Sequence, residues 1–467
     1  MLFSGIPFLY YFLPAVLMLY ALAPLGAKNL VLLIASLAFY FYGEPIYTLL
    51  MLGTIFLSYL FGLLIDRYRG RPAAGLFLIM SAAAGLFVLG FFKYADFFIS
   101  NTNALFHTDI PLLRLALPIG ISFYTFQTLS YTIDVYRGTA RVQKSFIRLA
   151  TYVAFFPQLI AGPIVRYTTI EEQLSSRSHS LENTARGFSR FIYGLAKKIL
   201  IANQLGELCD IFRGLENKST GFYWLYAVAF TLHIYFDFSG YSDMAIGLGR
   251  IFGFRFPENF NYPLVSQSIS EFWRRWHISL GTWFRDYVYI PLGGNRVSTG
   301  KWLRNIFVVW LLTGFWHGAD WTFILWGLLF AVCLLLERLF MGRLLSRLPR
   351  ALRHVYVWLI IMVSFVIFNA NGLAQAGSDL WGLLGGHDLP LWNAETGYYL
   401  RSYAVVLLLG FLGCCPLVKT ALQRLREREC ANRIIGWLEP VCLAALLLVM
   451  TAYLVDGSFN PFLYFRF

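Results

Sequence analysis

Long apolar runs are the feature that most constrains this chain. Most of them approach the ~20 residues that a helix needs to cross a hydrocarbon core. Hydrophobic residues make up 58% of the 467 positions and charged residues 13%, against roughly 45–50% and about 25% in soluble domains. The continuous runs lack the alternation of lipid-facing strands. The sequence therefore predicts an all-α, polytopic integral membrane protein. The predicted spans lie near residues 5–22, 29–43, 46–65, 73–92, 355–370, 402–418 and 438–455.

The basic residues predict the orientation of the chain. The net charge is +13, but the Lys and Arg residues fall largely in short loops between spans, where the positive-inside rule explains them. We therefore expect no nucleic-acid partner. The basic segments 65–72, 337–353 and 419–430 are assigned to the cytoplasmic side of the membrane. Counting spans from these segments places the N-terminus and the C-terminus outside.

Cysteines and long polar segments add little to the prediction. The six cysteines show no C-x-x-C spacing, so we expect neither a metal site nor a disulfide framework. The only long polar stretches, 168–190 and 371–400, are predicted to be loops and not domains. We therefore expect a single transmembrane domain over residues 1–467.

A short apolar hairpin carries the strongest functional signal. Basic residues bracket "RNIFVVWLLTGFWHGADWTFILWGLLFAVCLLLERL", residues 304–339. The apolar part is shorter than the ~40 residues that two full crossings take, so we expect the turn "FWHGAD" to lie within the membrane. His317 then sits at depth, with Gly318 giving close backbone approach and Asp320 as its neighbour. A turn at that depth must line protein or water, which favours a functional histidine over a core histidine bonded to a carbonyl.

A second histidine follows a predicted amphipathic helix. In the segment 268–296, Ser268 and Glu271 have capping-box spacing. Apolar residues recur at helical spacing on the face opposite the arginines, as in a helix that lies in the cytoplasmic interface. His277 lies on the side of Arg274, where an anionic cofactor would arrive. The alternative is an aromatic interfacial anchor with a solvated histidine and arginines that face lipid phosphates. The apolar stripe consists of Phe272, Trp276, Leu280 and Trp283.

Two further segments interrupt the apolar pattern with polar residues or prolines. In 231–250, His233 and Asp237 are i, i+4 neighbours on one helix face, and a buried structural pair is the expected role. In 155–167, Pro157 and Pro163 indicate a broken or re-entrant helix that lines a channel.

These motifs resemble a known family. The segments "SEFWRRWHISLGTWFRDYVYIPLGGNR", "LLTGFWHGADWTFILWG", "YFDFSGYSDMAIGLGRIFGFRFPENFNYP" and "FFPQLIAGPIVRY" are similar to the bacterial branch of the membrane-bound O-acyltransferases (MBOAT). The resemblance is nearest to the membrane subunit of alginate-type polysaccharide O-acetyltransferases and covers nearly the whole chain. It implies an MBOAT-like ring of helices around a central tunnel, with acetyl-CoA or another acyl thioester as donor and no metal.

The resemblance also implies roles for individual residues. His317 matches the catalytic histidine, and His277 matches a second, partly interchangeable polar signature. The expected donor-binding residues are Arg274, Arg275, Trp276 and Asn295. The expected tunnel-lining residues are Asp237, Ser239, Trp316 and Asp320. The expected partners are the lipid bilayer, an SGNH-type periplasmic or extracellular acetyltransferase, and the polysaccharide synthesis machinery.

An aromatic tail, "NPFLYFRF", closes the sequence at residues 460–467. Chain ends usually fray and carry polar residues, so something is expected to receive this tail. Phe462, Tyr464 and Phe467 match an F-x-Y-x-x-F pattern. In the related D-alanyl transfer system for teichoic acids, such a tail belongs to a separate small protein and its tyrosine is the assigned acyl acceptor. The resemblance therefore implies that Tyr464 accepts the acyl group; the alternative is an anchor at the bilayer surface.

Together these features predict a membrane O-acyltransferase. An acetyl group would pass from a cytoplasmic thioester across the membrane for O-acetylation of an extracellular or periplasmic polysaccharide, with His317 as base and Tyr464 as acceptor. Acyl transfer to peptidoglycan or teichoic acid is the first alternative. A transporter is the second, because broken helices and midplane polar groups are also typical of that class.

Overall fold

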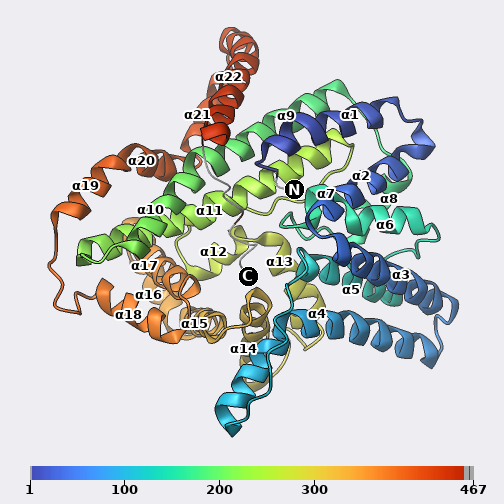
Figure 1. Cartoon of the computed structure of the whole chain (residues 1–467), viewed down its shortest axis with the longest axis horizontal. Helices are drawn as coiled ribbons and strands as arrows, with labels where there is room; N and C mark the ends of the chain where they lie inside the picture. The colour runs from blue at the N-terminus through green and yellow to red at the C-terminus, as the bar shows by residue number, and fades with distance from the viewer. Residues whose placement is uncertain (1–2, 457–461, 463–467) are drawn as a thin grey trace. The chain divides into compact units, whose positions relative to one another are not determined.

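The structure is a computed structural model of the chain, drawn in Figure 1, and it describes residues 3–456 and residue 462. Every regular element in this described part is a helix, which confirms the predicted all-α class. The chain divides into two compact units. Unit 1 comprises Met1–Phe191 and Ser242–Pro257, and unit 2 comprises Ile192–Tyr241 and Glu258–Phe467.

Unit 1 is built around packed apolar helices. Helices α3, α4 and α5 pack against one another, and α6 packs against α2 and α3. Helix α7 has a single turn, and the chain after it is irregular but buried up to Val165. The predicted break in segment 155–167 is therefore confirmed. The elements are η1 (Pro7–Phe12), α1 (Leu13–Leu22), η2 (Leu25–Ala27), α2 (Lys28–Gly43), α3 (Pro45–Arg67), α4 (Pro72–Phe106), α5 (Ile121–Arg137), α6 (Phe146–Ala154), α7 (Phe156–Leu159), α8 (Tyr167–Ser175) and most of α9 (Leu181–Ala196).

Unit 2 contains the segments that carry the predicted site. Helices α14 and α15 form a tight hairpin, and α17 packs against α15. The elements are η3 (Lys197–Ala202), α10 (Asn203–Gly214), most of α11 (Thr220–Ile251), η4 (Pro263–Val265), α12 (Ile269–Arg275), α13 (Ile278–Phe284), η5 (Arg285–Tyr289), α14 (Thr299–His317), α15 (Trp321–Leu336), η6 (Glu337–Met341), α16 (Gly342–Arg347), α17 (Arg350–Phe368), α18 (Leu373–Leu383), α19 (Ala394–Ser402), α20 (Ala404–Gly413), α21 (Leu417–Arg426) and α22 (Glu429–Asp456).

Six helices within the described residues are long and apolar enough to cross a membrane, and the bent pair α20 and α21 makes a seventh if it is one span. The predicted run at 5–22 corresponds to a shorter apolar helix, Pro7–Leu22. The chain is thus a multi-pass membrane protein. The six spans are Leu25–Gly43, Pro45–Arg67, Pro72–Phe106, Trp321–Arg347, Arg350–Phe368 and Glu429–Asp456.

The predicted loops at 168–190 and 371–400 were wrong as descriptions of local structure. The first contains nearly all of α8 and the start of α9, and the second contains α18 and most of α19. Their polar composition concealed short helices that bury only a few residues each. In α19, for example, Thr396 is buried and Tyr398 is exposed. Trp392, which precedes the helix, is also exposed.

Candidate active site

His317 lies at the turn of the α14–α15 hairpin, as predicted. It is the last residue of α14, and its side chain is 4% exposed. Its ring lies against aromatic rings from three helices, with centroid distances of 4.9 Å to Trp316, 4.9 Å to Trp326 and 5.4 Å to Phe368. An imidazole enclosed by aromatic rings is shielded from bulk water, which is the environment a positioned base requires.

The hairpin turn is held by backbone approach and by a helix cap. A side chain on Gly318 would collide with the Phe323 ring, and one on Gly314 would lie 2.3 Å from the carbonyl oxygen of Phe323. Asp320 is the N-cap of α15, where its carboxylate accepts a hydrogen bond of 2.8 Å from the Thr322 amide. The close approach expected of Gly318 is confirmed. The contact recorded for the Asp320 carboxylate is a capping bond.

The predicted amphipathic helix around His277 is broken, and the prediction of one interfacial helix was wrong. Helix α12 ends at Arg275 and α13 begins at Ile278, because His277 adopts a left-handed conformation with φ of 43°. The apolar stripe lies inside the protein and not on a membrane surface. Its four members, Phe272, Trp276, Leu280 and Trp283, are all buried. The apolar residues recur at helical spacing, but their burial against other segments is compatible with a break in the helix.

The ring of His277 is oriented by Asn259. Asn259 Oδ1 accepts hydrogen bonds from the Ser279 amide at 3.1 Å and from the Ser279 hydroxyl at 2.8 Å, and His277 Nδ1 lies 3.2 Å from the same oxygen. Because that oxygen accepts, Nδ1 carries the proton in the neutral ring, and Nε2 is the basic nitrogen. Nε2 is buried and has no hydrogen-bond partner among the described residues. His277 therefore presents a proton acceptor inside the protein.

Trp316 lies between the two histidines. Its ring centroid is 4.9 Å from that of His317 and 6.1 Å from that of His277. His277 also packs edge-on against Phe238 of α11, at 4.7 Å. The structure thus brings His277 to the neighbouring residues Trp316 and His317, which lie about 40 residues later in the sequence. Phe238 and Asn259 complete the cluster and were not predicted, because no sequence pattern links them to either histidine.

Asp237 forms a buried ion pair with Lys198 of η3. The Lys198 and Asp237 side chains are 0% and 1% exposed. His233 is buried as predicted, and its Nδ1 contacts the Ala202 carbonyl oxygen at 2.7 Å. His233 and Asp237 are therefore both buried, as predicted. Their contacts with Ala202 and Lys198 join each of them to a residue of η3. Lys198 was not predicted, because no local sequence pattern links it to Asp237, 39 residues further along the chain.

Phe462 is a described residue of the C-terminal tail, and its side chain is 1% exposed. Its ring packs edge-on against Tyr241 of α11 at 4.5 Å, and Lys198 Nζ lies 4.7 Å from its centroid. Tyr241 is three residues beyond Phe238, so the two lie on one face of α11. Tyr464 and Phe467 lie outside the described residues.

The predicted donor-binding residues differ in their exposure and their partners. Trp276 is packed in the interior against Phe272 and Phe365, and Arg275 pairs with Glu271 at 2.9 Å. Arg274 and Asn295 are exposed. Their role in binding a donor stays a prediction, as does the tunnel expected to be lined by Asp237, Ser239, Trp316 and Asp320. Ser239 is buried on α11. Each of the six cysteines is a free thiol, and no cluster of potential metal ligands is found in the described residues.

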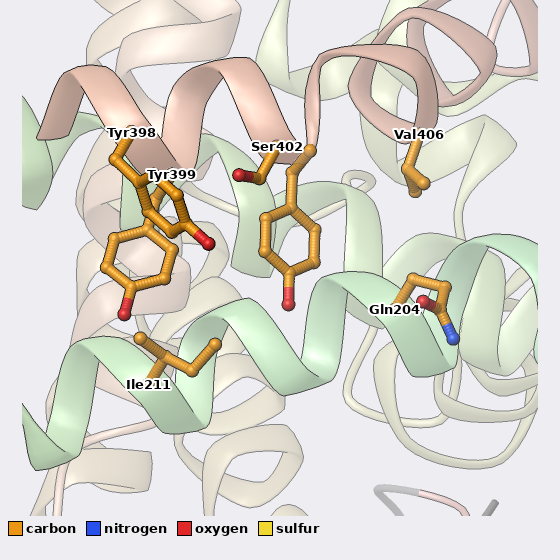
Figure 2. A pocket seen from close by; sticks show the side chains of 7 residues that line it. Gln204, Ile211, Tyr398, Tyr399, Ser402 and Val406 are labelled. Carbon is orange, nitrogen blue, oxygen red and sulfur yellow. The ribbon is translucent and has the colours of Figure 1, made fainter. Parts of the chain in front are cut away.

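A pocket of about 390 Å³ lies elsewhere in unit 2, between α10 and the α19–α20 segment. In Figure 2, Tyr398, Tyr399 and Ser402 face α10 across this pocket. None of the predicted site residues lines it. The pocket is thus separate from the histidine cluster. Its lining residues are Gln204, Ile211, Tyr398, Tyr399, Ser402, Tyr403 and Val406.

Comparison with known proteins identifies the class. Residues 139–373 match the model of the MBOAT, membrane-bound O-acyltransferase family. These residues include both histidines, the α14–α15 hairpin, α11 and Lys198. The chain belongs to the membrane-bound O-acyltransferase family and is an O-acyltransferase.

Individual relatives cover between about half of the chain and all of it. The chain is 43% identical to the probable alginate O-acetylase AlgI of Pseudomonas aeruginosa over 92% of its own length and 85% of that protein. It is 33% identical to the peptidoglycan O-acetyltransferase of Helicobacter pylori, over 100% of its own length and 98% of that protein. It is 31% identical to the teichoic acid D-alanyltransferase of Bacillus subtilis over 46% of its own length and 57% of that protein.

Proposed function

We propose that this protein moves an acetyl group from a cytoplasmic thioester such as acetyl-CoA across the inner membrane, for O-acetylation of an extracellular or periplasmic polysaccharide. His317 acts as the base and Tyr464 as the acyl acceptor. Full-length similarity to alginate O-acetylases supports the acetyl group and the polysaccharide acceptor. The inner membrane, with both termini outside, belongs to the same proposal.

One observation carries the proposal: Phe462, in the tail motif, is buried against α11, the helix whose Phe238 packs against His277. Phe462 contacts Tyr241, and Phe238, on the same face of α11, contacts His277. Three residues of an α-helix rise about 4.5 Å. A tail anchored at Phe462 therefore starts about one helical turn along α11 from the residue that contacts His277. This favours a reactive tail over an anchor at the bilayer surface, because a surface anchor would leave Phe462 in lipid.

The chemistry requires a base. In the proposed step the Tyr464 oxygen attacks the thioester carbonyl, a C–O bond forms, the C–S bond breaks and the thiolate leaves. His317 takes the phenolic proton. Forming phenolate in advance at pH 7 would cost on the order of 4 kcal/mol for a phenol of pKa about 10. A positioned base avoids much of that cost and typically contributes ~10² to 10⁴ in rate.

The choice of tyrosine fits a relay. The pKa of a thiol is about 8.5 and that of a phenol about 10, so the free-energy change from thioester to aryl ester is small. Transfer of the acetyl group from the aryl ester to an alkyl hydroxyl is then favourable. A partner outside, resembling the SGNH-type acetyltransferases, would carry out that second transfer to the polymer. Peptidoglycan is the alternative acceptor, supported by the likeness to the Helicobacter pylori protein.

The test is the covalent state of the C-terminal peptide. Purified protein is incubated with labelled acetyl-CoA, and the peptide is examined by mass spectrometry. We expect acetyl on Tyr464 in the unaltered protein and none in Tyr464→Phe, with both proteins inserted and monodisperse. Tyr453→Phe, which alters an exposed tyrosine of α22, is the matched control and is expected to keep the label.

Normal acetylation of the polymer in cells that produce Tyr464→Phe would contradict the proposal and favour a role of the tail as a membrane anchor. A transporter would show no covalent label on any variant, and full label after loss of His317 would assign the base elsewhere.

A further inference from the structure

A buried cation, Lys198, lies against the ring of Phe462. Lys198 and Asp237 are both inaccessible to solvent, and their charges are paired with each other. Burying two charges costs several kcal/mol per ion before their attraction is counted, and replacement by apolar residues is often neutral or stabilising. Such a pair is therefore a poor device for stability alone.

The local structure is built to place this lysine. Lys198 lies in a π-helical turn, Lys197–Ala202, inserted between α9 and α10, and π-helical turns occur frequently at functional sites. Gly240 of α11 allows the close approach, because a side chain there would lie 2.7 Å from the Gly194 carbonyl oxygen and 3.3 Å from the Lys198 amide nitrogen. The π-turn and the glycine together bring the Lys198 ammonium to Asp237.

Phe462 covers this pair. Lys198 Nζ is 4.7 Å from the centroid of the Phe462 ring, within the ~6 Å range of a cation–π contact. Tyr241 supports the ring from the side, at an interplanar angle of 86°. The ring thus meets a positive charge and an aromatic edge contact. An aliphatic side chain would bury the same apolar surface but would have no quadrupole to offer the ammonium.

We propose that Lys198, held in place by Asp237 and flanked by Tyr241, is the docking seat for Phe462, and that this seat positions the tail for acyl transfer. This inference rests on the proposed function, because it gives the seat the task of presenting Tyr464. Lys198, Asp237 and Tyr241 are positioning residues, not catalytic ones.

The seat limits how far Tyr464 can move. Two residues of extended chain span at most about 7 Å, so an anchored Phe462 keeps the Cα atom of Tyr464 within that distance of the Cα atom of Phe462. Tethering of this kind turns a search through solvent into an intramolecular encounter with a high effective concentration. Release of Phe462 would remove this advantage without changing either histidine.

Docking can be measured without any acyl transfer, by digestion of the tail with a carboxypeptidase. The detergent-purified protein carries Tyr464→Phe, so that no acetyl group forms. We expect digestion to slow when it reaches Phe462. Phe462→Leu removes the ring, and Lys198→Gln removes the charge but keeps a donor for Asp237; both should abolish the pause. Phe465→Leu, a change in the same tail outside the motif, should keep it. Size-exclusion profiles report whether each variant is folded.

Acetylation is measured on the same substitutions with Tyr464 present. We expect the initial rate of acetyl-Tyr464 formation to fall by about threefold to thirtyfold in Phe462→Leu, the range of a desolvated cation–π contact. Phe462→Trp should retain most of the rate. The apparent KM for acetyl-CoA should not change, because the seat holds the tail and not the donor.

The results separate this inference from the proposed function. If the pause depends on Lys198 and Phe462 while Tyr464 is never acetylated in any protein, the docking seat stands and the acyl relay fails. If the pause survives both substitutions, the seat does not hold Phe462 and the inference is overturned. It is also overturned if the pause is lost and acetylation proceeds at the full rate, because the seat then does not position the tail.

Discussion

His277 and His317 of unit 2 both lie at breaks in helical structure, but the two breaks have different causes. His317 ends α14 in a hairpin whose close packing depends on glycines, and its ring is enclosed by aromatic rings. His277 is itself the break: its backbone is left-handed, and its ring is bonded to Asn259. The position of His317 is thus determined by the packing of the hairpin around it. His277 is held by its neighbours as well, but its own backbone conformation also ends the helix.

This difference bears on what each residue can do. A left-handed conformation costs a non-glycine residue roughly 1–2 kcal/mol, and such strain persists only where the surrounding structure imposes it. At His277 the strain accompanies a fixed tautomer with a buried Nε2 acceptor. At His317 no such backbone cost is present. Substitution at 317 should therefore report on chemistry, whereas substitution at 277 should report on chemistry and folding together.

The largest expected effect is that of His317→Ala. We expect acetyl-Tyr464 formation to fall by about 10² to 10⁴, because the base is removed. Donor binding should persist, because the ring of His317 is not part of the predicted donor site. Mass spectrometry of the C-terminal peptide and equilibrium binding of labelled acetyl-CoA measure the two properties. His317→Gln, closer in size, controls for the cavity. Wild-type acetylation in His317→Gln would exclude His317 as the base.

An intermediate effect is expected at His277, where two substitutions separate backbone from side chain. Asn tolerates the left-handed region better than Ala does. The free energy of unfolding of His277→Asn should therefore exceed that of His277→Ala by about 1 kcal/mol. His277→Asn should accordingly have the higher melting temperature. Both lose the Nε2 acceptor. If the two variants lose activity equally, the ring is part of the chemistry. If activity follows stability and His277→Asn is nearly normal, the role of His277 is structural.

The same two regions show how far sequence reasoning reaches. The hairpin turn could be predicted because its short length and its glycine are local signals, and the turn does lie at His317 and Gly318. The break at His277 could not, because the apolar period continues from Phe272 to Trp283 without a glycine or proline at the break. Only the contacts of Trp276 and Asn259 with distant segments make it favourable.

Long-range pairs were also beyond the sequence pattern. Lys198 and Asp237 are 39 residues apart, and Phe462 comes from the far end of the chain. A lysine beside an apolar run carries the same local signal whether it faces lipid phosphates or a buried carboxylate. The tail motif, by contrast, is visible in the sequence as an F-x-Y-x-x-F pattern. The residues that contact Phe462, Lys198 and Tyr241, could be found only from the structure.

The smallest expected effect concerns Asp320, and it sharpens the comparison at the His317 turn. Loss of an N-cap costs about 1 kcal/mol, so Asp320→Ala should lower the melting temperature in detergent by roughly 2 °C. Asp320→Ser keeps a capping oxygen for the Thr322 amide and should restore most of that stability. If Asp320 only holds the turn, Ser restores acetyl-Tyr464 formation as well. If its carboxylate also lines the path of the acyl donor, Asp320→Ser recovers the melting temperature but not the rate, and the turn then places two reactive groups and not one.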